Sequence, residues 1–274
     1  MNTFLSRFAS KKAFYLITAI FVIVVLWWIT IFARGLTEGA ENQYFTTAYS
    51  IIALLSGIAG LVYAQKWGGF HSTLGSAIAM FAFGLIAQFL GQIIYSYYII
   101  VREIDVPYPS LGDISFFAAV LFNIYGSYLL AKVCGIRLSL KQFRGRALAI
   151  AIPALMLFVS YWLLLRGYEI DPSEYWLLFL DFGYPIGQAI FVSIALLTLF
   201  MSKDILGGMM RKSIILLLLA LISQFVFDFS FSYQYTYGEV YAGDALDLFH
   251  SVSYYLMTIA IFSIGNMFYK VQDS

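Results

Sequence analysis

Gln92, Asp181 and Asp228 are polar side chains that fall inside long apolar runs of the sequence. At about 1.5 Å per helical residue, each lies roughly 9–15 Å from one end of its run, within a hydrocarbon layer of about 30 Å. A polar or ionisable group at that depth is costly unless it faces a cavity or a partner. We therefore expect the three to meet in a ligand-binding site. The alternative is a purely structural hydrogen-bonding role.

Asp113 and Asp247 occur where apolar runs begin, in the segments Val106–Asp113 and Tyr241–Asp247. Ser110 with Asp113, and Asp244 with Asp247, have the spacing of a capping box, in which both side chains bond free N–H groups of the first helical turn. Capping alone is sufficient to explain these acids. Alternatively, they line the mouth of the same site, because each segment follows an apolar run that carries Gln92 or Asp228.

His250 follows Asp247 by three residues and precedes Tyr254 by four, so one helix face would carry all three. A histidine beside a carboxylate can relay protons, or it can be a hydrogen-bonded packing residue. Too few nitrogen and sulfur ligands occur nearby to predict a metal site. Tyr184 and Tyr254 belong to a set of aromatic residues at this depth that could wall a pocket for a small organic or lipid-like ligand.

No catalytic residue and no cofactor can be assigned from motifs. The sequence lacks a Ser-His-Asp context, an HExxH pattern and a phosphate-binding glycine loop, and no lysine falls in the middle of an apolar run. Cys134 is the only cysteine, so the chain cannot form an intrachain disulfide. We therefore expect binding rather than nucleophilic catalysis.

The composition indicates which kind of secondary structure must position these residues. Of the 274 residues 62% are hydrophobic and 11% are charged, which excludes a water-soluble globule. The net charge of +1 offers no basic patch for nucleic acid. The sequence predicts an all-α membrane protein, a single transmembrane domain (residues 1–274) whose immediate partner is the lipid bilayer. Its eight apolar runs cover residues 13–33, 46–65, 74–99, 113–132, 147–166, 174–201, 213–234 and 246–269.

The charges segregate between the two sides of the predicted membrane protein. Basic residues favour the cytoplasmic side. With a cytoplasmic N-terminus, the outer segments hold only Arg34, Arg102 and Arg166, and the inner ones hold Arg7, Lys11, Lys12, Lys66, Lys132, Arg137, Lys141, Arg144, Arg146, Lys203, Arg211, Lys212 and Lys270. Most acids fall outside, including Glu38, Glu41, Glu103, Asp105, Glu169, Asp171, Glu174, Glu239 and Asp244, while Asp204 and Asp273 fall inside. We expect a multi-pass protein of the cytoplasmic membrane with both termini in the cytoplasm and an outer mouth that attracts cations.

Similar residues recur about 135 positions apart, which is half the chain length and four apolar runs. The pairs are Trp27 and Trp162, Tyr49 and Tyr184, Gln88 and Gln224, Gln92 and Asp228, and Asp113 and Asp247. The shared offset predicts two parallel four-helix repeats, about residues 13–132 and 147–269, with the site between them.

Four segments together resemble the polytopic input modules that precede diguanylate cyclase or histidine kinase domains in bacteria: Gly91-Gln92, Pro107–Asp113, Asp181–Gln188 and Gly243–Leu248. The pattern of that family is a PSxAD turn, a later DxxYP and a closing GDxxDLLW. The resemblance covers most of the chain from about residue 80 and implies a membrane-embedded sensor. Gly112 and Gln188 stand where the family tends to have Ala and an acid. The chain ends at Ser274 without an output domain, so signalling would need a separate partner chain.

A fainter resemblance is to lysoplasmalogenase-type membrane proteins, carried by Phe83–Gln92 and Ile222–Asp228. It implies a lipid hydrolase that uses paired polar residues, and Gln92 in place of an acid departs from that pattern. Three functions therefore stand as hypotheses. The first is a sensor or small-molecule-binding module with an outward-facing pocket, and the others are the hydrolase and a cation- or proton-coupled transporter.

Overall fold

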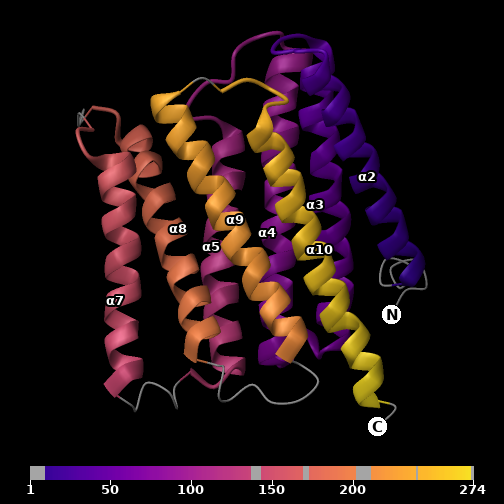
Figure 1. Cartoon of the computed structure of the whole chain (residues 1–274), viewed down its shortest axis with the longest axis vertical. Helices are drawn as coiled ribbons and strands as arrows, with labels where there is room; N and C mark the ends of the chain where they lie inside the picture. Colours follow the sequence, from indigo (N-terminus) through magenta and orange to yellow (C-terminus); the bar gives the residue numbers. More distant parts are fainter. Residues whose placement is uncertain (1–9, 137–142, 169–172, 202–210, 239, 273–274) are drawn as a thin grey trace.

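A computed structural model describes residues 10–136, 143–168, 173–201, 211–238 and 240–272 (Figure 1). Eight helices in this part are long and apolar enough to cross a membrane, and no strand occurs among the described residues. They are α2 (Lys11–Ala33), α3 (Ala40–Lys66), α4 (Thr73–Ser96), α5 (Leu111–Val133), α7 (Phe143–Ser160), α8 (Tyr175–Met201), α9 (Arg211–Tyr237) and α10 (Ala245–Gln272). The predicted all-helical chain with eight membrane-length helices is confirmed.

Short helical segments extend or join these elements. α4 continues as a π-helical turn, η3 (Tyr97–Val101), and α7 continues as a second one, η4 (Tyr161–Leu165), while the 3-10 turn η2 (Gly69–His71) precedes α4. Several charged residues used to predict orientation lie outside the described residues: Arg7, Arg137, Lys141, Glu169, Asp171, Lys203, Asp204, Glu239 and Asp273.

The helices run side by side, with α2 at one edge of the bundle and α7 at the other (Figure 1). α4 packs between α3 and α5, and α9 packs between α8 and α10. The two groups meet where α3 contacts α10 and where α5 contacts α8. The first residues of α2 and the last of α10 lie towards the same end of the bundle, and the α4–α5 and α9–α10 connections lie at the opposite end (Figure 1).

α3 begins earlier than the apolar run predicts. Its first residue is Ala40 rather than residue 46, because the polar residues that precede the run are themselves helical. Asn42, fully buried, donates from its amide to the main-chain oxygens of Leu36 and Ala242. This polar first turn ties α3 to the α9–α10 connection.

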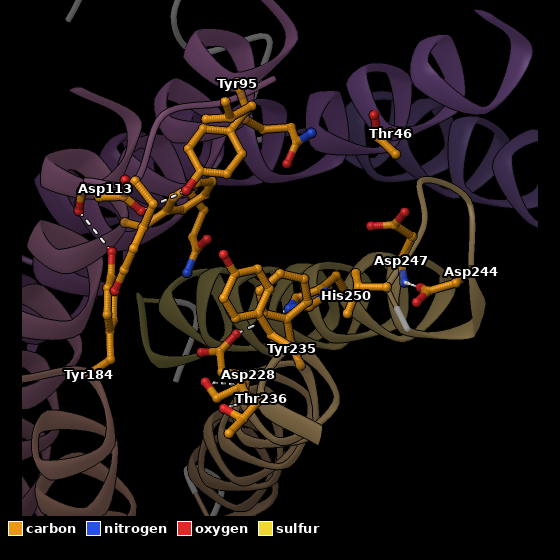
Figure 2. A pocket seen from close by; sticks show the side chains of 18 of the residues that line it. Thr46, Tyr95, Asp113, Tyr184, Asp228, Tyr235, Thr236, Asp244, Asp247 and His250 are labelled. Carbon is orange, nitrogen blue, oxygen red and sulfur yellow. Dashed lines mark hydrogen bonds and ion pairs between the residues drawn. The ribbon is translucent and has the colours of Figure 1, made fainter. Parts of the chain in front are cut away.

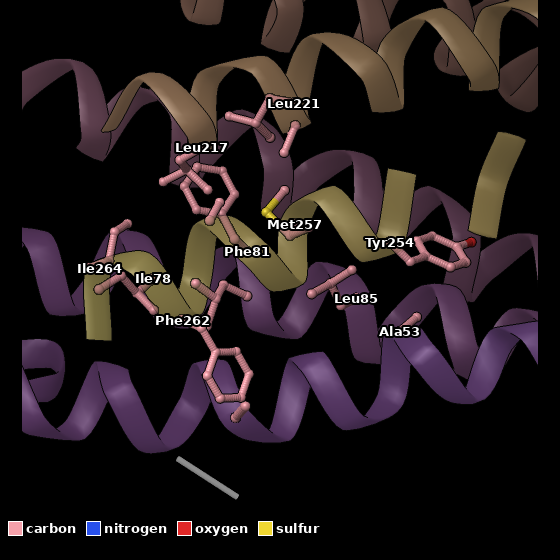
Figure 3. Packing of buried hydrophobic residues seen from close by; sticks show 14 of the residues in the cluster. Ala53, Ile78, Phe81, Leu85, Leu217, Leu221, Tyr254, Met257, Phe262 and Ile264 are labelled. Carbon is pink, nitrogen blue, oxygen red and sulfur yellow. The ribbon is translucent and has the colours of Figure 1, made fainter. Parts of the chain in front are cut away.

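An apolar core fills the part of the bundle nearer the end at which α3 joins α4. Figure 3 shows Ile78, Phe81 and Leu85 of α4 packed with Leu217 and Leu221 of α9 and with Met257, Phe262 and Ile264 of α10. Small residues bring the helices close: a Cβ at Gly60 of α3 would lie 2.9 Å from the Cβ of Ala82 in α4. The cavity described below lies beyond this core, towards the end at which α4 joins α5 and α9 joins α10.

Candidate functional site

A cavity of about 740 Å³ opens between six of the helices. Each helix contributes residues three or four positions apart, which is the spacing of a single helix face. The main lining residues are Gln43, Thr46 and Tyr49 of α3; Gln88, Gln92 and Tyr95 of α4; Asp113, Phe116 and Val120 of α5; Asp181, Tyr184 and Gln188 of α8; Asp228, Ser232 and Tyr235 of α9; and Asp247, His250 and Tyr254 of α10.

The structure brings every residue of the predicted site to this one cavity. These are Gln92, Asp113, Asp181, Tyr184, Asp228, Asp247, His250 and Tyr254. Figure 2 shows Asp113 and Tyr184 on one side, Asp244 and Asp247 on the other, and Asp228 with His250 between them. Gln92, Asp181 and Asp228 therefore line the same cavity.

Asp113 caps the start of α5, as its spacing predicts. Its Oδ2 accepts hydrogen bonds from the main-chain N–H of Ser110 at 2.7 Å and the hydroxyl of Ser110 at 2.8 Å, and its Oδ1 accepts from the Tyr95 hydroxyl at 2.6 Å. The hydroxyl of Tyr184 donates to the main-chain oxygen of Asp113 at 2.9 Å. Both carboxylate oxygens are thus engaged within the protein.

Asp244 and Asp247 do the same for α10. Asp244 Oδ1 accepts from the N–H groups of Leu246 and Asp247 at 2.8 and 3.1 Å. Asp247 accepts from the Gly243 N–H at 2.7 Å and from the Tyr49 hydroxyl at 2.9 Å. Burial raises the pKa of Asp244 above its usual range, against the opposing effect of the N–H donors. The predicted capping is confirmed, and these acids line the cavity as well.

Asp181 is held by two phenols rather than by a helix terminus. Tyr108 donates to its Oδ1 at 2.7 Å, and Tyr168 donates to its Oδ2. Burial, followed by this hydrogen bond, raises the pKa of Tyr108, and the bond to Asp181 raises the pKa of Tyr168 to about 12. Both phenols therefore remain protonated near neutral pH. They hold the carboxyl group by neutral donors that bring no positive charge.

Asp228 and His250 form a dyad at the cavity wall, with side chains 12% and 13% exposed. His250 Nδ1 lies 2.9 Å from the Leu246 carbonyl, which can only accept, so Nδ1 carries a proton. His250 Nε2 lies 3.3 Å from Asp228 Oδ1, which also accepts from Gln224 at 2.7 Å. A hydrogen bond between Nε2 and the carboxyl group needs one more proton, on either partner. With that proton the dyad has no net charge.

Gln188 is the polar side chain of the cavity whose role the sequence does not reveal. It is 4% exposed, and its Oε1 has no hydrogen-bond partner among the described residues. A buried amide without a partner is uncommon and calls for an explanation. Its position four residues after Tyr184 and seven after Asp181 on the same helix face was the available signal.

Sequence reasoning also missed several partners of the predicted residues. Tyr108 and Tyr168 hold Asp181, Tyr49 bonds Asp247, and Gln88 accepts a hydrogen bond from Tyr254 at 3.4 Å. Tyr108 lies between α4 and α5 and Tyr168 follows η4, so no helical spacing relates either of them to Asp181. Tyr49 was recognised only as a repeat partner of Tyr184.

The cavity offers carboxylates, amides and phenols but no clustered metal ligands. In the part of the chain that the structure describes, no three His, Cys, Asp or Glu side chains converge as they would around a metal ion. Comparisons with protein-family models, with curated proteins and with solved structures found no match to the chain.

Proposed function

We propose that this protein is a membrane-embedded binding module, acting as a sensor, whose ligand is a small molecule that enters the cavity from the end at which α4 joins α5 and α9 joins α10. The observation that carries the proposal is the cavity itself. Its volume of about 740 Å³ falls within the range of roughly 300–1,000 Å³ typical of ligand sites. Aromatic walls with a few fixed polar groups are the usual composition of such sites.

One polar atom of the cavity lining has no hydrogen bond that would explain its presence by folding. The Oε1 of Gln188 is buried and has no partner among the described residues. An internal amide without a partner weakens a fold but can hold a ligand. This favours a binding role for the cavity over a purely structural one.

We also propose that the cavity lies between two parallel four-helix repeats. Lining residues pair across the offset of about 135 positions: Thr46 with Asp181, Tyr49 with Tyr184, Gln92 with Asp228, Tyr95 with Phe231, Asp113 with Asp247 and Val120 with Tyr254. The two tyrosines also bond the acid of the opposite half: Tyr49 donates to the carboxylate of Asp247, and Tyr184 donates to the main-chain oxygen of Asp113.

The distribution of charge indicates the side of the membrane to which the cavity would open. The described basic residues other than Arg34, Arg102 and Arg166 lie towards the end of the bundle at which α3 joins α4, which would be the cytoplasmic end. The cavity would then open to the outside of the cytoplasmic membrane. In that arrangement the helices that line the cavity would transmit ligand binding to a separate partner chain.

A cavity-filling variant tests the binding function. Gln92→Trp places an indole in the cavity, and Ile93→Trp places the same side chain on the next residue, which is 38% exposed and lines no part of it. The parent and the Ile93→Trp protein should release the same small molecule on denaturation, identified by mass spectrometry, and the Gln92→Trp protein should release less than a tenth as much. Equal amounts from all three would overturn the cavity as the binding site.

Two further measurements separate the alternatives. Purified parent protein is incubated with a panel of lysolipids, and it is reconstituted in vesicles with a pH gradient or a membrane potential. We expect neither product release nor ligand flux that depends on Asp228. Turnover of a lysolipid that Asp228→Asn abolishes would favour the hydrolase, and gradient-driven flux would favour the transporter.

A further inference from the structure

We infer that the ligand of this cavity is an organic cation, an ammonium group carried on an apolar body. The inference rests on the proposed binding function and goes beyond it by naming the ligand's chemistry. It follows from the charges of the lining, from its aromatic walls and from the amide of Gln188.

The charges of the lining have one sign. Asp113, Asp181, Asp244 and Asp247 face the cavity, and its lining, all of it in the described part of the chain, includes no lysine or arginine. Their hydrogen bonds come from N–H groups, hydroxyls and an amide, all neutral, so no bond within the protein cancels the negative charge. The dyad of Asp228 and His250 adds no net charge. A cation that enters the cavity gains attraction from all four acids.

The walls suit an organic cation better than a metal ion. Aromatic rings from several helices line the cavity: Tyr49, Tyr95, Phe116, Tyr184, Phe231 and Tyr254. The faces of such rings attract ammonium groups and also bury apolar surface. An inorganic ion would need converging ligands, and no three His, Cys, Asp or Glu side chains of the described residues meet in that way. The volume also exceeds what a bare ion would fill.

The amide of Gln188 provides an independent observation. Its Oε1 is buried, accepts no hydrogen bond from the described residues, and belongs to the cavity lining. Gln188 lies seven residues beyond Asp181, which is about 10 Å further along α8. An acceptor without a partner in an acidic cavity would be satisfied by an N–H donor. A primary ammonium group provides both that donor and the positive charge.

Three matched probes test the charge: phenylethylammonium, its neutral isostere propylbenzene and the anion phenylpropionate. Binding to the full chain is measured by thermal shift and calorimetry in a non-ionic maltoside detergent, which brings no cationic headgroup. We expect the ammonium probe to bind at least ten-fold more tightly than propylbenzene, and the anion to bind most weakly. Gln92→Trp should abolish this binding and Ile93→Trp should leave it intact. Equal or tighter binding of the neutral or anionic probe would overturn the inference.

A fourth probe tests the role of Gln188. Phenylethyltrimethylammonium carries the same charge without an N–H donor, so it cannot satisfy Oε1. The parent should prefer the primary ammonium probe, and Gln188→Leu should remove that preference while it keeps the preference for cations over propylbenzene. Asp181→Asn should weaken the binding of both cationic probes. An unchanged preference in Gln188→Leu would overturn the assigned contact.

The ammonium group could belong to a free amine or to a lipid headgroup. Displacement of phenylethylammonium by short-chain phosphatidylethanolamine, and not by a short-chain phosphatidylglycerol, would assign the lipid source; no displacement by either would assign a free amine. The proposed function fails separately. Suppose that none of these probes binds, but that denaturation releases another molecule from the parent and not from the Gln92→Trp protein. The binding function is then supported, and the inference of a cationic ligand is wrong. If nothing binds or co-purifies, both are wrong.

Discussion

At the scale of single residues, the polar groups of the cavity are of two kinds: those that are hydrogen-bonded within the protein and those that are not. The oxygens of Asp113 and Asp247 accept hydrogen bonds from Ser110 and Gly243, which precede α5 and α10, and from tyrosines, so these acids stabilise the fold as well as line the cavity. Gln188 Oε1 has no such partner. A ligand that satisfies Gln188 therefore adds a hydrogen bond without breaking one that holds a helix.

The dyad of His250 and Asp228 leads to a prediction about stability. His250→Phe removes the Nε2 contact and leaves a carboxyl group that is 12% exposed with Gln224 alone. The loss should lower the free energy of unfolding by roughly 1–3 kcal/mol. His250→Gln can still donate an N–H to Asp228 and should lose less. Thermal unfolding in detergent, followed by tryptophan fluorescence, measures both.

The control for this prediction is the second of the two histidines. His71 is exposed, in the turn η2. His71→Phe should stay within about 0.5 kcal/mol of the parent, as surface substitutions do. A His250→Phe protein as stable as the His71→Phe protein would show that the dyad contributes nothing to the fold.

At the scale of elements, the start of α10 depends on Asp244, and its raised pKa predicts a pH dependence. A carboxyl group whose pKa is higher in the folded than in the unfolded chain binds its proton more tightly when folded. Its contribution to stability is complete below the unfolded pKa and is lost as pH rises through the folded pKa. Asn keeps the capping oxygen and cannot ionise. Asp244→Asn should therefore match the parent near pH 4 and become the more stable protein as pH rises to 8, measured by thermal unfolding.

Asp244→Ala is the matched variant for the capping itself. It removes the acceptor for the N–H groups of Leu246 and Asp247, and neither Ala nor Asn can ionise, so it should be less stable than Asp244→Asn by about 1 kcal/mol at every pH. If Asp244→Asn instead fell below the parent as pH rose, the negative charge would be favourable at this position, and burial would not be the dominant effect.

Helix packing explains the glycine at position 112. A Cβ there would lie 2.5 Å from the ring of Tyr95. That ring donates its hydroxyl to Asp113, so the small residue and the large one are a matched pair between α4 and α5. The absence of a side chain at Gly112 therefore lets α4 and α5 approach closely enough for Tyr95 to bond Asp113.

At the scale of the whole molecule, the helices could be predicted from the sequence, and the contacts between them could be predicted only in part. Apolar runs predicted all eight helices because length and hydropathy are local properties. Gln92, Asp181 and Asp228 were predicted to meet because polar groups in apolar runs are costly. Gln188 was not predicted as a site residue, because the sequence does not show whether a buried amide finds a partner within the protein. The bonds of Tyr108 and Tyr168 to Asp181 depend on segments between helices, whose paths no periodicity specifies.

The orientation of the whole molecule can be tested with single cysteines. Glu38 is exposed between α2 and α3, and Phe70, 62% exposed, lies between α3 and α4 at the opposite end of the bundle. The native Cys134 is buried, and burial raises its pKa to about 12, so it should remain unlabelled and needs no replacement. In intact cells a membrane-impermeant maleimide should label Glu38→Cys and not Phe70→Cys, which should react only after permeabilisation. The reverse pattern would place the cavity on the cytoplasmic side, and labelling of both from outside would contradict a membrane crossing by α3.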